Sequence, residues 1–153
     1  MSQTGIITPV SSVDGTHFTT AVAQNASEFE AIALPQAVGV DGVGRCRIKD
    51  LTIWSTDNLA WEVGIWGHAS PKSADPNGDY FMGRWTFVVA DGVQEDAAGL
   101  FRYYVNGLDI LYFDAMNTGR IYLTLVNRSA GAKTAAPAGK FRLRLGCENT
   151  SGF

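Results

Sequence analysis

The segment from Leu100 to Cys147 is the part of the chain that most restricts its fold. It alternates aromatic and aliphatic runs with short turn sequences, and it predicts strands at residues 100–105, 108–114, 120–127 and 140–147. Asn106-Gly107 separates the first two runs. This dipeptide favours a two-residue type I′ hairpin turn, because Asn and Gly both tolerate the positive φ that such a turn requires. The segment therefore predicts consecutive antiparallel strands.

The preceding residues extend the same pattern. Further strands are predicted at residues 17–23, 28–34, 45–55, 59–66 and 80–90. Between Ile48 and Leu51 the apolar positions change phase, which predicts a β-bulge near Lys49-Asp50. About eight or nine short strands separated by turns, with no convincing helix, indicate an all-β protein. We expect an antiparallel β-sandwich of jelly-roll-like type.

The length of the chain predicts one domain. A chain of 153 residues can bury one substantial core, whereas two independent domains would each be marginal. Residues 1–15 mix Thr, Ser, Gly, Val and Ile around one Pro without a dominant period, and they predict an extended N-terminal arm. Residues 16–153 are expected to form the single β-sandwich domain. On this interpretation, deletion of residues 2–15 leaves the fold intact and weakens assembly.

The composition favours association with other proteins. Charged residues make up 18% of the chain, below the roughly 25% of typical globular domains. A surface with few charges suggests that part of it is covered by a partner or by further copies of the chain. The net charge of −3, without a basic stripe, argues against nucleic acid. No apolar run approaches the roughly 20 residues of a membrane helix, and the first residues lack the pattern of a secretory signal.

The residue types that carry catalysis do not form a recognisable pattern. The chain has two histidines, His17 and His68, and no G-x-S-x-G nucleophile motif. Glu62 has no second acid beside it on its strand, so we expect it to face solvent or to pair with an arginine. The sequence predicts no enzyme activity, no cofactor, and no catalytic or metal-ligating residue.

Two further features have simple interpretations. Cys46 and Cys147 are expected to be buried thiols, although a single disulfide remains an alternative. The segment Asp75–Asp79 is expected to form an Asx and Gly turn. Its alternate oxygen-bearing residues leave calcium binding open.

Large aromatic residues lie on both faces of the predicted strands. Trp61 and Trp85 share a phase with aliphatic neighbours and are predicted to lie in the core. Trp54 and Trp66 lie on the opposite parity or at strand ends, where an indole can stack on a sugar or anchor a protein interface. The residues predicted to contact a partner or a glycan are Trp54, Trp66, Tyr104, Tyr112, Tyr122, Arg142 and Arg144.

The chain resembles the small β-sandwich decoration (cement) proteins of tailed-phage heads. The resemblance rests on its size, the Ser/Thr/Gly-rich segment Ser2–Gly15, the strand pattern from Arg45 to Cys147, and the lack of a signal peptide and an active-site motif. It implies a virion structural protein, made in the host cytoplasm, that binds the major capsid protein and stabilises the lattice as a homo-oligomer, often a trimer. The alternative is a carbohydrate- or receptor-binding β-sandwich module, such as a tail or fibre component.

Overall fold

A computed structural model describes residues 7–11, 22–26, 32–35, 45–68, 80–96, 99–113, 120–132 and 142–149. Within these ranges it contains strands and one short 3-10 helix, η1 (Val89–Asp91). The strands are β1 (Ile7–Ser11), β2 (Ile32–Pro35), β3 (Arg45–Ser55), β4 (Trp61–Trp66), β5 (Phe81–Phe87), β6 (Val93–Gln94), β7 (Phe101–Val105), β8 (Ile110–Phe113), β9 (Arg120–Asn127) and β10 (Arg142–Asn149). No helix in these ranges is long and apolar enough to cross a membrane.

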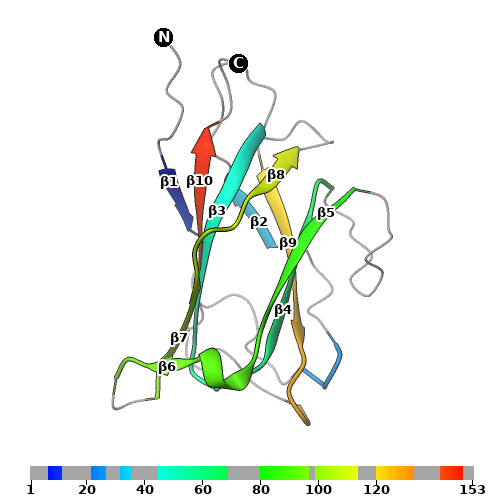
Figure 1. Cartoon of the computed structure of the whole chain (residues 1–153). Coiled ribbons are helices and arrows are strands. Elements are labelled where there is room, and N and C mark those ends of the chain that lie inside the picture. The colour runs from blue at the N-terminus through cyan, green and yellow to red at the C-terminus, as the bar shows by residue number, and fades with distance from the viewer. Residues whose placement is uncertain are drawn as a thin grey trace.

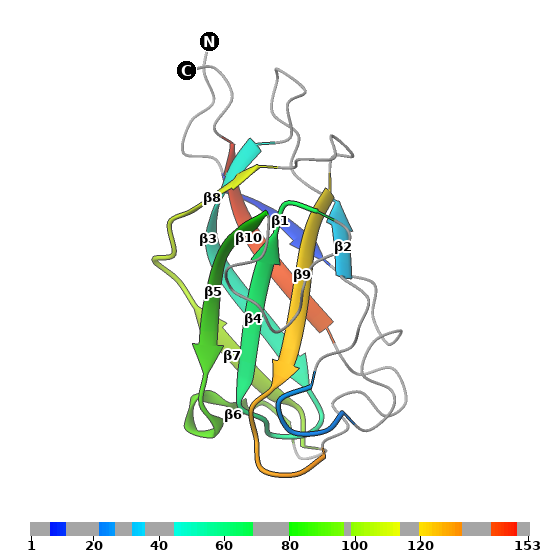
Figure 2. The ribbon, with the colours of Figure 1, turned by 90° about the vertical axis from the view of Figure 1, so that its right-hand side faces the viewer.

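The strands form two antiparallel sheets that pack face to face (Figure 1). The larger sheet has the order β1-β10-β3-β7-β6, with β8 also paired to β3. The smaller sheet has the order β2-β9-β4-β5, and Figure 2 shows it in front of the larger one. If β7 and β8 are counted as one strand, the eight main strands follow the jelly-roll order of two interlocked Greek keys. The predicted all-β, jelly-roll-like sandwich is confirmed.

The bulge predicted in β3 is present. In the pairing of β3 with β10, Gly146 lies opposite Asp50 and Cys147 lies opposite Ile48, so Lys49 is the extra residue. The extra residue lets Ile48 and Leu51, which have opposite parity, both point inward, where each is fully buried. β3 also begins and ends at the predicted residues.

The prediction of a hairpin at Asn106-Gly107 is wrong. β7 and β8 do not pair with each other, because both pair antiparallel with β3, one after the other along its length. The residues between them form an irregular insertion in one interrupted strand, and Leu108 N donates to Lys49 O at 3.0 Å beside the bulge. Gly107 has the positive φ, +72°, that is expected of a turn residue. A local dipeptide preference therefore identified the backbone conformation but not the pairing partner.

The core lies between the sheets and is built mainly from the inward-facing side chains of both, with Val22, Leu59 and Leu108 added from the connections. Trp61 is fully buried, as predicted. Trp85 is 37% exposed, so its predicted core position is wrong. It lies opposite Val63, but β5 is the edge strand of the smaller sheet and leaves one side of the indole uncovered. The fully or nearly fully buried hydrophobic side chains include Cys46, Ile48, Leu51, Ile53, Leu59, Trp61, Val63, Ile65, Tyr103, Tyr112, Ile121, Leu123, Leu125, Leu143, Leu145 and Cys147.

Part of the predicted N-terminal arm belongs to the sandwich. Ile7–Ser11 forms β1, which pairs antiparallel with β10 from Ile7 opposite Glu148 to Ser11 opposite Arg144. The prediction of a separate arm is therefore wrong for residues 7–11. The other residues of the range 1–15 lie outside the described part of the chain. Without β1, the outer edge of β10 would be unpaired, and an extended segment with unpaired backbone groups can pair with such an edge.

The other strand predictions differ mainly at their ends. β9 has the predicted bounds, and β10 begins and ends two residues later than predicted. β5 ends at Phe87, three residues before the predicted end, because the chain turns into η1, which begins at Val89. Most of the predicted strand at 17–23, the first residues of the one at 28–34, and the segment Asp75–Asp79 lie outside the described residues.

Candidate functional site

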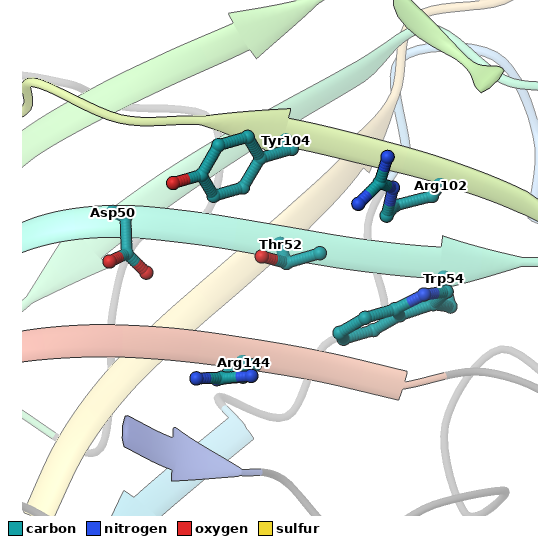
Figure 3. A pocket seen from close by; sticks show the side chains of 6 residues that line it. All are labelled: Asp50, Thr52, Trp54, Arg102, Tyr104 and Arg144. Carbon is teal, nitrogen blue, oxygen red and sulfur yellow. The ribbon is translucent and has the colours of Figure 1, made fainter. Parts of the chain in front are cut away.

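The outer face of the larger sheet carries a shallow hollow of about 250 Å³. Its lining comes from three neighbouring strands: β3 in the middle, β7 on one side and β10 on the other (Figure 3). The lining residues are Asp50, Thr52, Trp54, Arg102, Tyr104 and Arg144.

The alternation of side chains along each strand positions these residues. On β3, Leu51 and Ile53 point into the core, so the residues between and beside them point outward. The same rule applies on β7, where Tyr103 is fully buried and Tyr104 is 52% exposed. The register then aligns the rows, because Thr52 lies opposite both Arg144 and Tyr104. Every residue of the hollow thus lies on a strand whose other face is part of the core.

The arginines around the hollow differ in their partners. The guanidinium of Arg142 lies 5.9 Å from the centre of the Trp54 ring, within the range of a cation–π contact. Arg102 Nε lies 2.6 Å from Glu95 Oε1 in an ion pair. Arg144 is exposed and forms no hydrogen bond or ion pair with any residue in the described ranges. Among the described residues, its guanidinium is therefore the cation of this hollow without a hydrogen-bonding or charged partner.

A close approach between two strands places the Asp50 carboxylate. The α-carbon of Gly146 lies directly beneath it, and a Cβ at that position would overlap Asp50 Oδ2. A side chain at position 146 would therefore displace the Asp50 carboxylate from this position. The result is a carboxylate that extends across β10 on the same face as Arg144 (Figure 3).

A separate charged cluster lies farther along the same face. Asp109 Oδ1 accepts from Lys49 Nζ at 3.0 Å and from Arg47 Nη1 at 3.1 Å, and Lys49 Nζ lies 3.6 Å from Glu148 Oε2. The hydrogen bond with Lys49 is the main reason why the pKa of the Asp109 carboxyl lies below its usual value. That bond likewise raises the pKa of Lys49. These two cations and two anions balance each other, so this cluster leaves no unpaired charge comparable to that of Arg144.

Four of the predicted contact residues gather on this face. Trp54, Tyr104 and Arg144 line the hollow, and Arg142 stacks beside Trp54. The residues predicted to make contacts did not include Asp50, Thr52 and Arg102. Their signal was available, because Asp50 and Thr52 share the parity of Trp54, and Arg102 shares that of Tyr104.

The other three predicted contact residues are buried, so their expected surface role is corrected. Trp66 is 2% exposed and its Nε1 donates to Thr124 Oγ1 at 3.0 Å on the smaller sheet. Tyr122, on the same sheet, is 4% exposed. Tyr112 is fully buried. Tyr104 and Tyr112 are both at even positions, which predicts the same face, but the insertion between β7 and β8 shifts the alternation by one residue and turns Tyr112 inward.

Glu62 forms the expected ion pair. Its Oε2 accepts from Nε and Nη2 of Arg128 at 3.0 and 2.9 Å, and Arg128 Nη1 donates to Asn25 Oδ1 at 2.9 Å. This contact ties β4 to the loop that follows β9. In the ranges that the structure describes, no group of three or more His, Cys, Asp or Glu side chains is arranged to hold a metal ion.

The two cysteines are buried free thiols, as expected. A hydrogen bond with Cys46, together with burial, raises the pKa of the Cys147 thiol. The Cys147 thiol therefore remains protonated, and both cysteine side chains pack as small apolar groups.

Comparisons with known proteins identify no relative: no family model, no curated protein and no solved structure matches this chain.

Proposed function

We propose that this protein is a non-enzymatic virion structural protein of the decoration type, which binds the surface of a viral head as a homo-oligomer and stabilises the capsid lattice. The observation that carries the proposal is a group of exposed apolar residues at one end of the sandwich. A jelly roll is compatible with this role, since viral capsid domains use the fold, but lectin domains use it as well. Because the fold does not distinguish the two roles, the proposal is argued from the exposed residues on the surface of the sandwich.

The apolar end consists of Val88, Val89 and Val93, which are 60%, 44% and 54% exposed. They lie on and beside η1 and β6, at the end of the sandwich remote from β8 (Figure 1). Contiguous exposed apolar residues of this kind mark surfaces that contact other proteins. An interface here would remove the three valines from water.

The apolar end continues into the hollow. Val93 on β6 lies directly opposite Arg102 on β7, so the two residues are neighbours on the same face of the larger sheet. Beyond Arg102 lie Trp54 and Tyr104. Trp, Tyr and Arg are the residue types that most often dominate the energetics of protein interfaces, and here they adjoin the exposed valines. On a lattice, even a modest interface of this kind would gain strength from the many copies that bind together.

The test is to locate the protein on particles. Virus particles would be purified from the source of this gene and analysed by mass spectrometry and by immunoelectron microscopy with an antibody against this chain. Labelling distributed over the head is the expected result. Labelling confined to the tail would replace the decoration role with that of a tail or fibre component, and absence from purified particles would overturn the proposal.

A second candidate function is carbohydrate or receptor binding, and the hollow specifically favours it. Trp54 and Tyr104 offer ring surfaces on which the apolar face of a sugar can stack. Asp50 and Thr52 offer oxygen atoms for its hydroxyl groups. Ligand sites generally combine such apolar surfaces with a few convergent polar groups.

A further inference from the structure

We propose that the hollow on the outer face of the larger sheet binds an acidic sugar, meaning a pyranose ring that carries a carboxylate, at the end of a glycan or within it. This inference rests on the carbohydrate-binding candidate function and adds the chemical class of the ligand. It is tested on the free protein, separately from the position of the protein on a particle.

The size of the hollow favours a single ring. Its volume of about 250 Å³ is slightly below the roughly 300–1,000 Å³ of pockets that enclose drug-sized ligands. It lies open on a sheet face, so the remainder of a glycan chain could extend into solvent. Tyr104, which is 52% exposed, and Trp54 line opposite sides of Thr52 (Figure 3). Their rings are the apolar surfaces available for stacking.

The unpaired arginine of the hollow favours an acidic group on the ligand. Arg144 has no partner in the described ranges, whereas Arg102 is paired with Glu95 and Arg142 stacks on Trp54. A guanidinium can bind a carboxylate with two parallel hydrogen bonds, which provides both strength and orientation. The carboxylate of the ligand is therefore expected at the Arg144 side of the hollow.

The remaining polar groups favour a sugar over an acidic peptide. The Asp50 carboxylate forms no hydrogen bond or ion pair within the described residues, and it would repel a second negative charge. It can instead accept hydrogen bonds from hydroxyl groups, which a sugar supplies and an aspartate- or glutamate-rich segment does not. The hollow has the Arg144 guanidinium on one side and the Asp50 carboxylate on another. A ligand with one acidic end and several hydroxyl groups matches this arrangement.

The experiment compares matched probes on the full-length protein. Isothermal titration would measure binding of a glucuronate-terminated oligosaccharide and its glucose-terminated counterpart, and of a sialylated oligosaccharide and its desialylated form. An aspartate-rich peptide would serve as a probe for acidic protein surfaces. The variants are Arg144→Ala and Asp50→Asn. Arg84→Ala is the matched control, because Arg84 is an exposed arginine on β5 of the other sheet.

We expect at least one acidic oligosaccharide to bind more tightly than its neutral counterpart. Arg144→Ala should weaken that binding about tenfold, the loss typical of one charge-assisted contact, and should remove the preference for the acid. Asp50→Asn should weaken binding to the sugar without abolishing the preference. Arg84→Ala should leave the affinity unchanged. Circular dichroism and the melting temperature would verify that each variant is folded.

The other outcomes separate this inference from the proposals on which it rests. Equal binding of acidic and neutral probes would overturn the acidic class and keep the carbohydrate-binding candidate. Binding of none of the oligosaccharides would overturn both. Equal or tighter binding of the aspartate-rich peptide would assign the hollow to an acidic protein surface. The decoration role is decided independently by the labelling of particles.

Discussion

At the scale of single residues, glycines at close approaches between strands determine where several large side chains lie. Gly64 makes room for the Trp66 indole, since a Cβ at position 64 would be 2.8 Å from Trp66 Nε1 and 2.6 Å from Thr124 Oγ1. Gly146 makes room for the Asp50 carboxylate in the same way. A glycine inside a strand usually weakens the strand, because it has no side chain to pack. These two glycines instead leave the space that a specific neighbouring side chain occupies.

Gly64→Ala should therefore lower the free energy of unfolding by about 1–3 kcal/mol, the usual cost of forcing an extra methyl group into a packed site. Urea denaturation would measure the change. Gly83→Ala is the matched control, because its Cβ would approach no atom more closely than 3.4 Å, the distance to Ile110 Cδ1. If the two variants were equally stable, the Trp66 and Thr124 side chains would be able to move aside for a methyl group at position 64, and the prediction would be wrong.

Tyr103 gives the protein a dependence on alkaline pH. Its hydroxyl donates to Asn58 Oδ1 and accepts from Leu59 N–H at 2.8 Å. Burial is the main cause that raises the pKa of Tyr103 from 10.0 to about 12. The folded protein thus holds this proton more tightly than the unfolded chain. Its stabilising contribution is complete below pH 10 and is lost as the pH rises from 10 towards 12.

Tyr103→Phe should consequently reduce stability at about pH 7, by about 1–3 kcal/mol for the lost hydrogen bonds. The difference between the parent protein and the variant should narrow between pH 10 and about 12, at no more than about 1.4 kcal/mol per pH unit. Unfolding in urea at graded pH would measure both the loss of stability at about pH 7 and its decrease at alkaline pH. Other groups that titrate in this range affect the parent protein and the variant equally, so their contribution cancels in the difference. A constant difference over this window would contradict the assignment.

At the scale of secondary-structure elements, pairing partners differ from what local turn signals indicate. β7 and β8 are adjacent in sequence yet lie end to end against β3. Gly107 adopts φ +72°, and a Cβ added there would have no atom within 4 Å, so its environment is open, as for a turn residue. The conformation of the dipeptide is a local property. The choice of partner depends on burial of Tyr103, Tyr112 and the facing residues of β3, which are distant in sequence.

β1 is the element whose role differs most from the sequence prediction. It pairs with β10 over five residues, so a chain that lacks residues 1–11 loses the edge strand of the larger sheet. Each lost backbone hydrogen bond contributes about 0.5–1.5 kcal/mol, and we expect the free energy of unfolding to fall by more than about 1 kcal/mol. The melting temperature should fall accordingly. A chain that lacks only residues 1–5 retains β1 and is the control.

If both truncated chains were as stable as the parent protein, residues 7–11 would contribute nothing to the sandwich. Residues 7–11 would then belong to the predicted N-terminal arm, which is not needed for folding.

At the scale of the whole molecule, the sandwich has two distinct outer surfaces. The outer face of the smaller sheet buries Trp66, Tyr122 and Thr124, whereas that of the larger sheet leaves Tyr104 and Arg144 exposed. Continuity between the larger sheet and the apolar end at Val93 makes this side of the molecule the strongest candidate for contact with other copies or with a capsid.

Light scattering at graded protein concentrations should accordingly detect an oligomer, with a trimer expected from the resemblance to decoration proteins. Val89→Lys combined with Val93→Lys should shift the protein towards monomer, because two charges would be buried at the interface. Thr86→Lys is the control, since Thr86 is exposed on β5 outside the apolar end. A parent protein that stays monomeric at all concentrations would contradict self-association through this end.

The sequence by itself determined the all-β class, the bounds of β3 and β9, the bulge at Lys49 and the burial of Trp61. These features follow from alternation within one strand, which depends only on residues close together in the chain. Asp50, Thr52 and Trp54 likewise share a face because they occupy alternate positions of β3. Their common orientation could have been predicted once the bulge was placed.

Only the tertiary structure decided which strands are neighbours. It therefore decided that Arg102, Tyr104 and Arg144 meet the β3 residues in one hollow, that β1 completes the larger sheet, and that Trp66 is buried while Trp85 is exposed. The physical reason is that strand pairing and edge position depend on contacts between residues far apart in the chain. Alternation assigns a side chain to one of two faces, but the neighbouring strands determine whether that face is covered.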